Sequence, residues 1–253
     1  AEAVEKTPQG KTVNMKLAQL LVDVFRSQSV AVLGNVVVAM GLAALIAFIY
    51  QHQTGEPLMN SENIAYQLHR IDPLDGSLWF AAIAGVWLFC SGIISGYFDN
   101  RSNYLNMRMR LAQHPLLKKL MSEKSRVKFA NYMHENYGSL IGNLCFGMLL
   151  GITGVVGYLT HLPLDIRHVA FSSANVGYIA VSGQFTYSLL LQCIGFVLLI
   201  GLVNLIVSFS LTLWVALRSL NTEIDSWWAI WHEVCQIVKK RPLSLFFPVQ
   251  LDK

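Results

Sequence analysis

Four long apolar runs alternate with polar segments along the chain of 253 residues. They cover residues 30–50, 78–97, 139–159 and 188–217, and none of them contains Asp, Glu, Lys or Arg. A helix needs about 20 residues to cross the roughly 30 Å hydrocarbon core of a bilayer, and each run meets that length. The runs are continuous and lack the polar alternation of barrel strands. The pattern therefore predicts an all-α, polytopic membrane protein with four transmembrane helices.

Composition and charge support this prediction. Hydrophobic residues make up 54% of the chain and charged residues only 13%, whereas soluble domains hold about 25% charged residues. Of the 19 Lys and Arg residues, only Arg70 and Arg167 lie in the first and third connections between the runs. Because Lys and Arg concentrate on the cytoplasmic side of a membrane, we expect both termini in the cytoplasm.

These boundaries divide the chain into five segments. We expect a cytoplasmic amphipathic segment at 1–28, a first transmembrane hairpin at 29–97 and a basic cytoplasmic helical loop at 98–137. A second transmembrane hairpin with an outer loop follows at 138–217, and a cytoplasmic, Trp-rich amphipathic tail at 218–253. Apolar residues at helical spacing predict a surface helix at 12–27, and Pro115 suits the first turn of another helix.

The basic loop carries eight Lys or Arg residues against a single acidic residue, Glu123, within residues 100–129. We expect this cluster to set the topology and to contact anionic lipid headgroups. Nucleic-acid contact is the alternative interpretation, because phosphate backbones attract the same side chains. The candidate residues are Arg108, Arg110, Lys118, Lys119, Lys124, Arg126 and Lys128.

The tail contains an apolar stripe at helical spacing. Three tryptophans on an amphipathic helix just beyond a span are typical of an interfacial helix in the headgroup layer. Packing against a soluble domain of the same complex is the alternative. The stripe consists of Ile224, Trp227, Trp228, Trp231, Val234 and Val238.

The outer loop between the third and fourth runs holds the densest polar motif, LPLDIRHVAFSSAN at 162–175. His161, Asp165 and His168 are of the residue types that bind a metal. Ser172 or Ser173 near His168 has the composition of a nucleophile and its base. These catalytic and metal interpretations are the minority ones, and we expect no metal and no cofactor.

The favoured interpretation of this motif is structural. Pro163 should end the third helix by about His161, and Asp165 should pair with Arg167 or His168. Local backbone bonds of Ser172, Ser173 and Asn175 suggest a compact re-entrant or capping turn. We expect that turn to pack against the first outer loop, residues 51–77, near Pro73–Asp75.

Polar residues also occur within the apolar runs, on what we expect to be the cytoplasmic half of each span. They could line a path, but such residues more often bond between helices. The pairs Gly92/Gly96 and Gly147/Gly151 similarly favour close helix packing. The polar residues are Asn35, Ser91, Ser95, Asn143, Asn204 and Ser208.

Several motifs together resemble a known family. They are LGN at 33–35, FAAIAGVWLFCSGIISGYFDN at 80–100, HPLLKK at 114–119, IGNLCFG at 141–147, LPLDIRHVAFSSAN at 162–175 and VSFSLTLWVALRS at 207–219. Over nearly the whole chain they resemble the bacterial integral membrane proteins named site-specific recombinases. Members of that family are longer, so the resemblance implies that this chain is their C-terminal transmembrane portion and lies in the bacterial inner membrane.

The family name implies DNA breakage and joining. A tyrosine recombinase gathers Arg, Lys and His around a Tyr nucleophile, and a serine recombinase places several Arg around a Ser. The nearest candidates in this chain are Arg167, His168, Ser172, Ser173 and Tyr178.

Three functions therefore stay open. The first choice is a non-enzymatic membrane module for scaffolding or transport at the envelope. The second is the site-specific recombinase of the family name, and the third is a membrane-embedded hydrolase or metal enzyme. We expect lipid headgroups, the upstream part of the same protein or other membrane subunits as partners, with a homo-oligomer also open and no nucleic acid.

Overall fold

The computed structural model describes residues 8–183, 186–219 and 226–245, and these are helical with no strand among them. Four of the helices are long and apolar enough to cross a membrane. They are α1 (Pro8–Thr54), α3 (Ser77–Tyr104), α6 (Glu123–Thr160) and α8 (Tyr187–Ser219). The prediction of an all-α protein with four such helices is confirmed.

The chain divides into two compact units, each built from separated segments. Unit 1 comprises residues 1–65, 169–198 and 215–253, and unit 2 comprises residues 66–168 and 199–214. Helix α8 therefore contributes its two ends to unit 1 and its middle to unit 2. The division into five topological segments remains a prediction.

In unit 1, α1 is a single helix of 47 residues. The surface helix expected at 12–27 and the apolar run at 30–50 are one continuous element, because no Gly or Pro interrupts residues 11–33. The short helix α7 (Val169–Val181) packs against α1. Gly177 lies so close to the Met40 carbonyl that a Cβ there would overlap it. Helix α7 therefore lies beside the middle of the 30–50 run.

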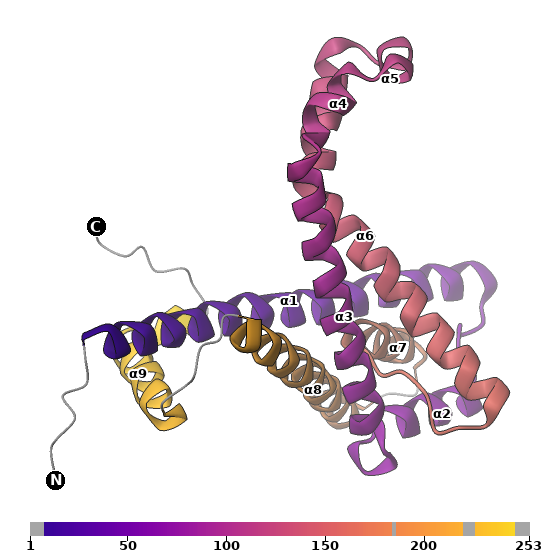
Figure 1. Cartoon of the computed structure of the whole chain (residues 1–253). Helices are drawn as coiled ribbons and strands as arrows, with labels where there is room; N and C mark the ends of the chain where they lie inside the picture. Colours follow the sequence, from indigo (N-terminus) through magenta and orange to yellow (C-terminus); the bar gives the residue numbers. More distant parts are fainter. Residues whose placement is uncertain (1–7, 184–185, 220–225, 246–253) are drawn as a thin grey trace, which may run out of the picture. The chain divides into compact units, whose positions relative to one another are not determined.

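A second short helix, α9 (Trp227–Lys240), also packs against α1 and runs across it near its N-terminal end (Figure 1). Ser226 caps α9 by accepting a hydrogen bond from the Ala229 amide. The 3₁₀ turn η2 (Pro242–Leu245) follows, and Arg26 donates a 3.2 Å hydrogen bond to the Ser244 carbonyl. The predicted tail helix is present, although Ile224 lies outside the described residues.

In unit 2, α3 and α6 lie side by side as a hairpin (Figure 1). Glycines in α6 allow the close approach: the Gly138 amide donates to Asp99 Oδ1, and Ser91 Oγ donates to the Gly142 carbonyl. Trp87 Nε1 donates to Thr153 Oγ1 at 2.9 Å. These hydrogen bonds join α3 to α6 at several positions along the hairpin.

At one end of this hairpin lie the helices α4 (Met107–Gln113) and α5 (Pro115–Leu120) (Figure 1). Pro115 occupies the first turn of α5, as predicted. Helix α6 begins 16 residues before the 139–159 run, so it extends about 24 Å beyond it at 1.5 Å per residue. We call residues 101–128 at this end the basic tip.

The opposite end of the hairpin is closed by α2 (Ser61–Ile71), the 3₁₀ turn η1 (Pro73–Asp75) and residues 161–168. Helix α6 ends at Thr160, and His161 caps it with a left-handed backbone (φ 54°), which agrees with the predicted end near His161. We call this non-helical stretch the 161–168 segment.

Candidate functional site

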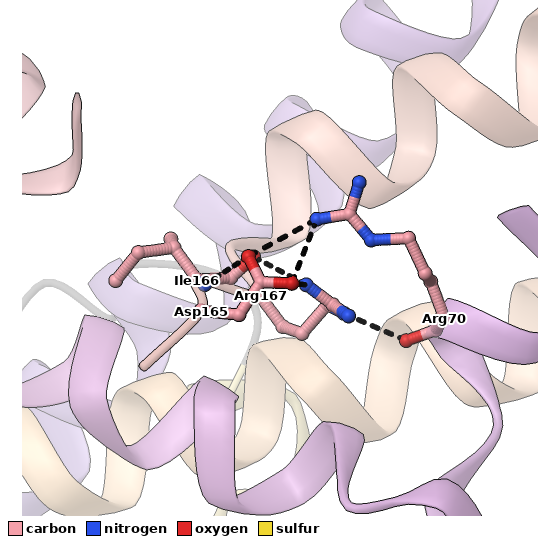
Figure 2. A network of polar contacts seen from close by, with 4 residues as sticks. All are labelled: Arg70, Asp165, Ile166 and Arg167. Carbon is pink, nitrogen blue, oxygen red and sulfur yellow. Dashed lines mark hydrogen bonds and ion pairs between the residues drawn. The ribbon is translucent and has the colours of Figure 1, made fainter. Parts of the chain in front are cut away.

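The 161–168 segment is organised around the carboxylate of Asp165 (Figure 2). Arg167 Nη1 lies 2.6 Å from Asp165 Oδ2, and Arg70 Nη2 lies 3.1 Å from both carboxylate oxygens. The Ile166 amide also donates to Asp165 Oδ1 at 2.7 Å. The predicted pair of Asp165 with Arg167 is therefore present, and Arg70 is added to it.

Arg167 is the most deeply buried member of this Arg70–Asp165–Arg167 cluster, with a side chain only 8% exposed. Its Nε donates to the Arg70 carbonyl at 2.7 Å, and its backbone amide donates to the Phe80 carbonyl at 3.4 Å. Its guanidinium also lies 5.2 Å from the centre of the Phe80 ring. One side chain thereby joins the segment to the end of α2 and the start of α3.

Electrostatics agree with a tightly bonded cluster. Burial alone would raise the pKa of the Asp165 carboxyl, but the hydrogen bonds from Arg167 and Ile166 and both guanidinium charges hold it below its usual range. Burial lowers the pKa of Arg167, and its hydrogen bond to Asp165 opposes that shift. Asp165 is therefore ionised at neutral pH, as a partner of a buried arginine needs to be.

Asn204, in the middle of α8, belongs to the same end of unit 2. Its buried amide donates to the Ala81 carbonyl at 2.7 Å and to the Arg167 carbonyl at 3.1 Å. These partners belong to the end of unit 2 that holds α2, η1 and the 161–168 segment, and the predicted location of Asn204 in the cytoplasmic half of its span stays a prediction. Hydrophobic periodicity alone does not specify which residues of the long helix α8 contact α3 and the 161–168 segment.

The other intramembrane polar residues do not share one location. Ser91 bonds α3 to α6, and Ser95 lies against Gly142 of the same pair. Ser208 is half-buried, whereas Asn35 and Asn143 are exposed. Ser91, Ser95 and Asn204 thus have positions expected of packing residues.

The candidate catalytic serines lie in a helix and not in the predicted turn. Ser172 and Ser173 of α7 are buried, and Ser173 Oγ donates to the Val169 carbonyl at 2.6 Å. Such bonding within the helix satisfies a hydroxyl without interrupting an otherwise apolar sequence. Asn175 and Tyr178 belong to the same helix and are half-buried.

His168 lies at the end of the 161–168 segment, with its ring 5.1 Å from that of Phe146 in an edge-to-face arrangement. Burial lowers the pKa of His168 to about 4, so the ring is neutral at pH 7. His161 is exposed at the helix cap. Within residues 8–183, 186–219 and 226–245, no three His, Cys, Asp or Glu side chains gather as a metal site would require.

Arg70 was not predicted as a site residue, although it is central to the observed cluster. It and Arg167 are the two basic residues of the predicted outer loops. Each of these two loops holds one arginine, and Asp165 lies two residues before Arg167. This pattern could have predicted that both arginines bind the same aspartate. The predicted contact with the first outer loop is made through Arg70, and Arg167 bonds in addition to the Phe80 carbonyl at the start of α3.

The basic tip has the opposite character. Arg108, Arg110, Lys118, Lys119, Lys124 and Lys128 are exposed. Arg126 is half-buried and donates a 2.6 Å hydrogen bond from Nε to the Ala112 carbonyl, which ties α4 to α6. Tyr104, Met109, Leu116 and Leu120 are also exposed there. The tip is thus a surface both basic and apolar.

Comparison with known proteins adds a family. The sequence profile of the family described as site-specific recombinase matches residues 1–248. The chain belongs to the site-specific recombinase family. No curated protein and no solved structure matches it. For this family member, the resemblance noted in the sequence is confirmed over nearly its full length.

Proposed function

We propose that this site-specific recombinase family member is a non-enzymatic module of the bacterial inner membrane that displays its basic tip in the cytoplasm. The observation that carries the proposal is the α3–α6 hairpin. It is closed at one end by the Arg70–Asp165–Arg167 cluster and extends about 24 Å beyond its apolar run at the other. A hairpin that is stabilised by ion pairs at one end and exposes basic residues at the other suits a scaffold that positions a partner.

The bonding of the candidate catalytic groups supports a structural role. The Arg167 guanidinium is engaged by Asp165 and two carbonyl groups, and the Ser173 hydroxyl is buried and bonded within its own helix. A nucleophile must reach its substrate, and an arginine that stabilises a transition state must point its donors at it. Neither group has that freedom in this arrangement.

The distribution of basic residues supports the cytoplasmic placement of the tip, because the positive-inside rule counts charges close to the spans. Single-cysteine labelling in intact cells tests it. In a background without the four native cysteines, Leu74→Cys should react with a membrane-impermeant maleimide, since Leu74 is 93% exposed. Lys119→Cys should react only after lysis. Labelling of Lys119→Cys in intact cells would overturn the orientation.

A second candidate function is DNA recombination, which the family name and the exposed charges of the tip favour. If the tip contacts several phosphates, affinity for duplex DNA should fall linearly in log[salt]. The double variant Lys118→Glu/Lys119→Glu should then weaken binding, whereas Lys239→Glu/Lys240→Glu, with the same charge change on α9, should not. Purified protein that shows no binding at low salt would eliminate this candidate.

A further inference from the structure

Helix α9 presents three large tryptophans that its packing against α1 leaves uncovered. Trp227, Trp228 and Trp231 are 50%, 83% and 59% exposed, whereas Ile230 in the same helix is 1% exposed. The buried isoleucine identifies the side of α9 that faces α1. The tryptophans therefore take no large part in the internal packing.

The helical positions divide α9 into three sectors. At about 100° per residue, Trp227, Trp231 and Cys235 fall within about 80° of one another, and Trp228 borders them. Ile230 and Ile237 lie on the side toward α1, while His232, Gln236, Lys239 and Lys240 lie on the remaining exposed side. Helix α9 crosses α1 (Figure 1), so by helical position the tryptophan flank lies beside the contact with α1 and not within it.

The position of α9 along α1 identifies what can cover this flank. Arg26 of α1 bonds to Ser244 just after α9, and the buried side chains nearby on α1 are Ala18 and Val22. Val22 precedes the start of the 30–50 run by eight residues, which is about 12 Å along the helix. Side chains on α9 reach about 5–6 Å from its axis. Tryptophans directed toward the 30–50 run would therefore reach the headgroup layer, which extends about 5–8 Å beyond the hydrocarbon core.

Chemistry points to the same layer. Trp is enriched at membrane interfaces, where its ring is apolar and its N–H finds a polar partner. The exposed ammonium groups of Lys239 and Lys240 follow at the C-terminal end of α9, where lipid phosphates would attract them. Helix α8 ends at Ser219 and seven residues separate it from α9, so the chain also tethers α9 close to a helix long and apolar enough to span the membrane.

We propose that the tryptophan flank of α9 docks into the headgroup layer of the membrane that the chain spans, with Lys239 and Lys240 at anionic phosphates. Helix α9 then anchors the N-terminal part of α1 against the bilayer. This inference is independent of the proposed function, because it holds whether the basic tip binds a scaffolded partner or DNA.

Tryptophan quenching by spin-labelled lipid tests the proposal on the full chain in nanodiscs containing anionic lipid. The signal of the flank is the difference between the unaltered protein and Trp227→Phe/Trp228→Phe/Trp231→Phe, which keeps the aromatic surface. We expect a headgroup-proximal label to quench this signal at least 2-fold more than a label near the acyl terminus. We also expect little quenching by aqueous iodide.

Two outcomes would overturn the proposal. Strong iodide quenching without lipid quenching would place the flank in water, and protection from both quenchers would place it under another protein or a second copy. The charge variant Lys239→Glu/Lys240→Glu should weaken the headgroup-label quenching. The matched variant Lys118→Glu/Lys119→Glu, on the basic tip, should leave it unchanged, and equal effects of the two variants would contradict the role given to Lys239 and Lys240.

Discussion

The two ends of the α3–α6 hairpin use charge in opposite ways. At one end, Arg70 and Arg167 surround one aspartate, and Arg167 is buried and bonded to backbone carbonyls. At the other end, six of the seven candidate basic residues have exposed side chains. A charge that is bonded inside the protein acts on stability, and one that faces outward acts on partners. The number of basic residues in a segment is therefore a poorer guide to its role than their bonding.

The largest expected effect comes from removing Asp165, the carboxylate at the centre of the Arg70–Asp165–Arg167 cluster. Asp165→Ala leaves the buried Arg167 without its anion and should lower the free energy of unfolding by about 4 kcal/mol. Thermal unfolding of the purified protein in detergent measures it. Lys119→Ala, at the exposed end, is the matched control. An Asp165→Ala protein as stable as the parent would show that the cluster does not hold this end together.

A pH series should show a slightly smaller effect at the same end. Burial depresses the pKa of His168 to about 4, and the unfolded side chain titrates near 6.5, so the unfolded state binds more protons between these values. The contribution of neutral His168 to the free energy of unfolding should therefore be complete above about pH 6.5, and that free energy should fall by about 3 kcal/mol as the pH drops to 4. His168→Gln should remove this part of the slope. The depressed pKa of Asp165 adds a further loss, which begins below about pH 4. A parent protein with the same slope as His168→Gln would contradict the burial of the ring.

Glycine substitutions sharpen the comparison within α6 itself. A Cβ on Gly157 would overlap the Leu164 carbonyl of the 161–168 segment, whereas a Cβ on Gly151 would meet nothing within 4 Å. Gly157→Ala should therefore destabilise the protein by about 2 kcal/mol through overpacking, while Gly151→Ala should be neutral or slightly stabilising because alanine favours a helix. Unfolding in a denaturing detergent series compares the two variants. Equal effects would mean that the segment does not pack on α6 as described.

The exposed end should give the smallest effects on stability. Lys118→Ala and Lys119→Ala remove solvated charges and should each change the free energy of unfolding by less than about 0.5 kcal/mol. The same unfolding assay measures this. A loss above about 1 kcal/mol would show that the tip contributes to the stability of the fold.

The long-range features of this fold could be predicted from the sequence because lipid restricts the choices so strongly. Uncharged runs of about 20 residues have few alternatives to a spanning helix, and the end of α6 followed from Pro163. Helix α7 was missed because its 13 residues are too few for a span and its serines suggested a turn. So short a helix is recognised from its packing against α1, where Gly177 closely approaches the Met40 carbonyl.

The candidate site was predictable only where its residues are close in the sequence. Asp165 and Arg167 are close in sequence, so their pairing needed only local geometry. Arg70 is 95 residues from Asp165, and Asn204 follows Arg167 by 37 residues. Such contacts depend on how helices pack, which hydrophobic periodicity does not specify.

A double-mutant cycle between Arg70 and Asp165 tests most directly whether the closed end is held by its own charges. Arg70→Ala, Asp165→Ala and the double variant are compared by unfolding free energy. Because these side chains meet at 3.1 Å in a partly buried site, we expect a coupling energy of about 1 kcal/mol or more, so that the double variant loses less than the sum of the two. Additive losses, within about 0.3 kcal/mol, would contradict the account.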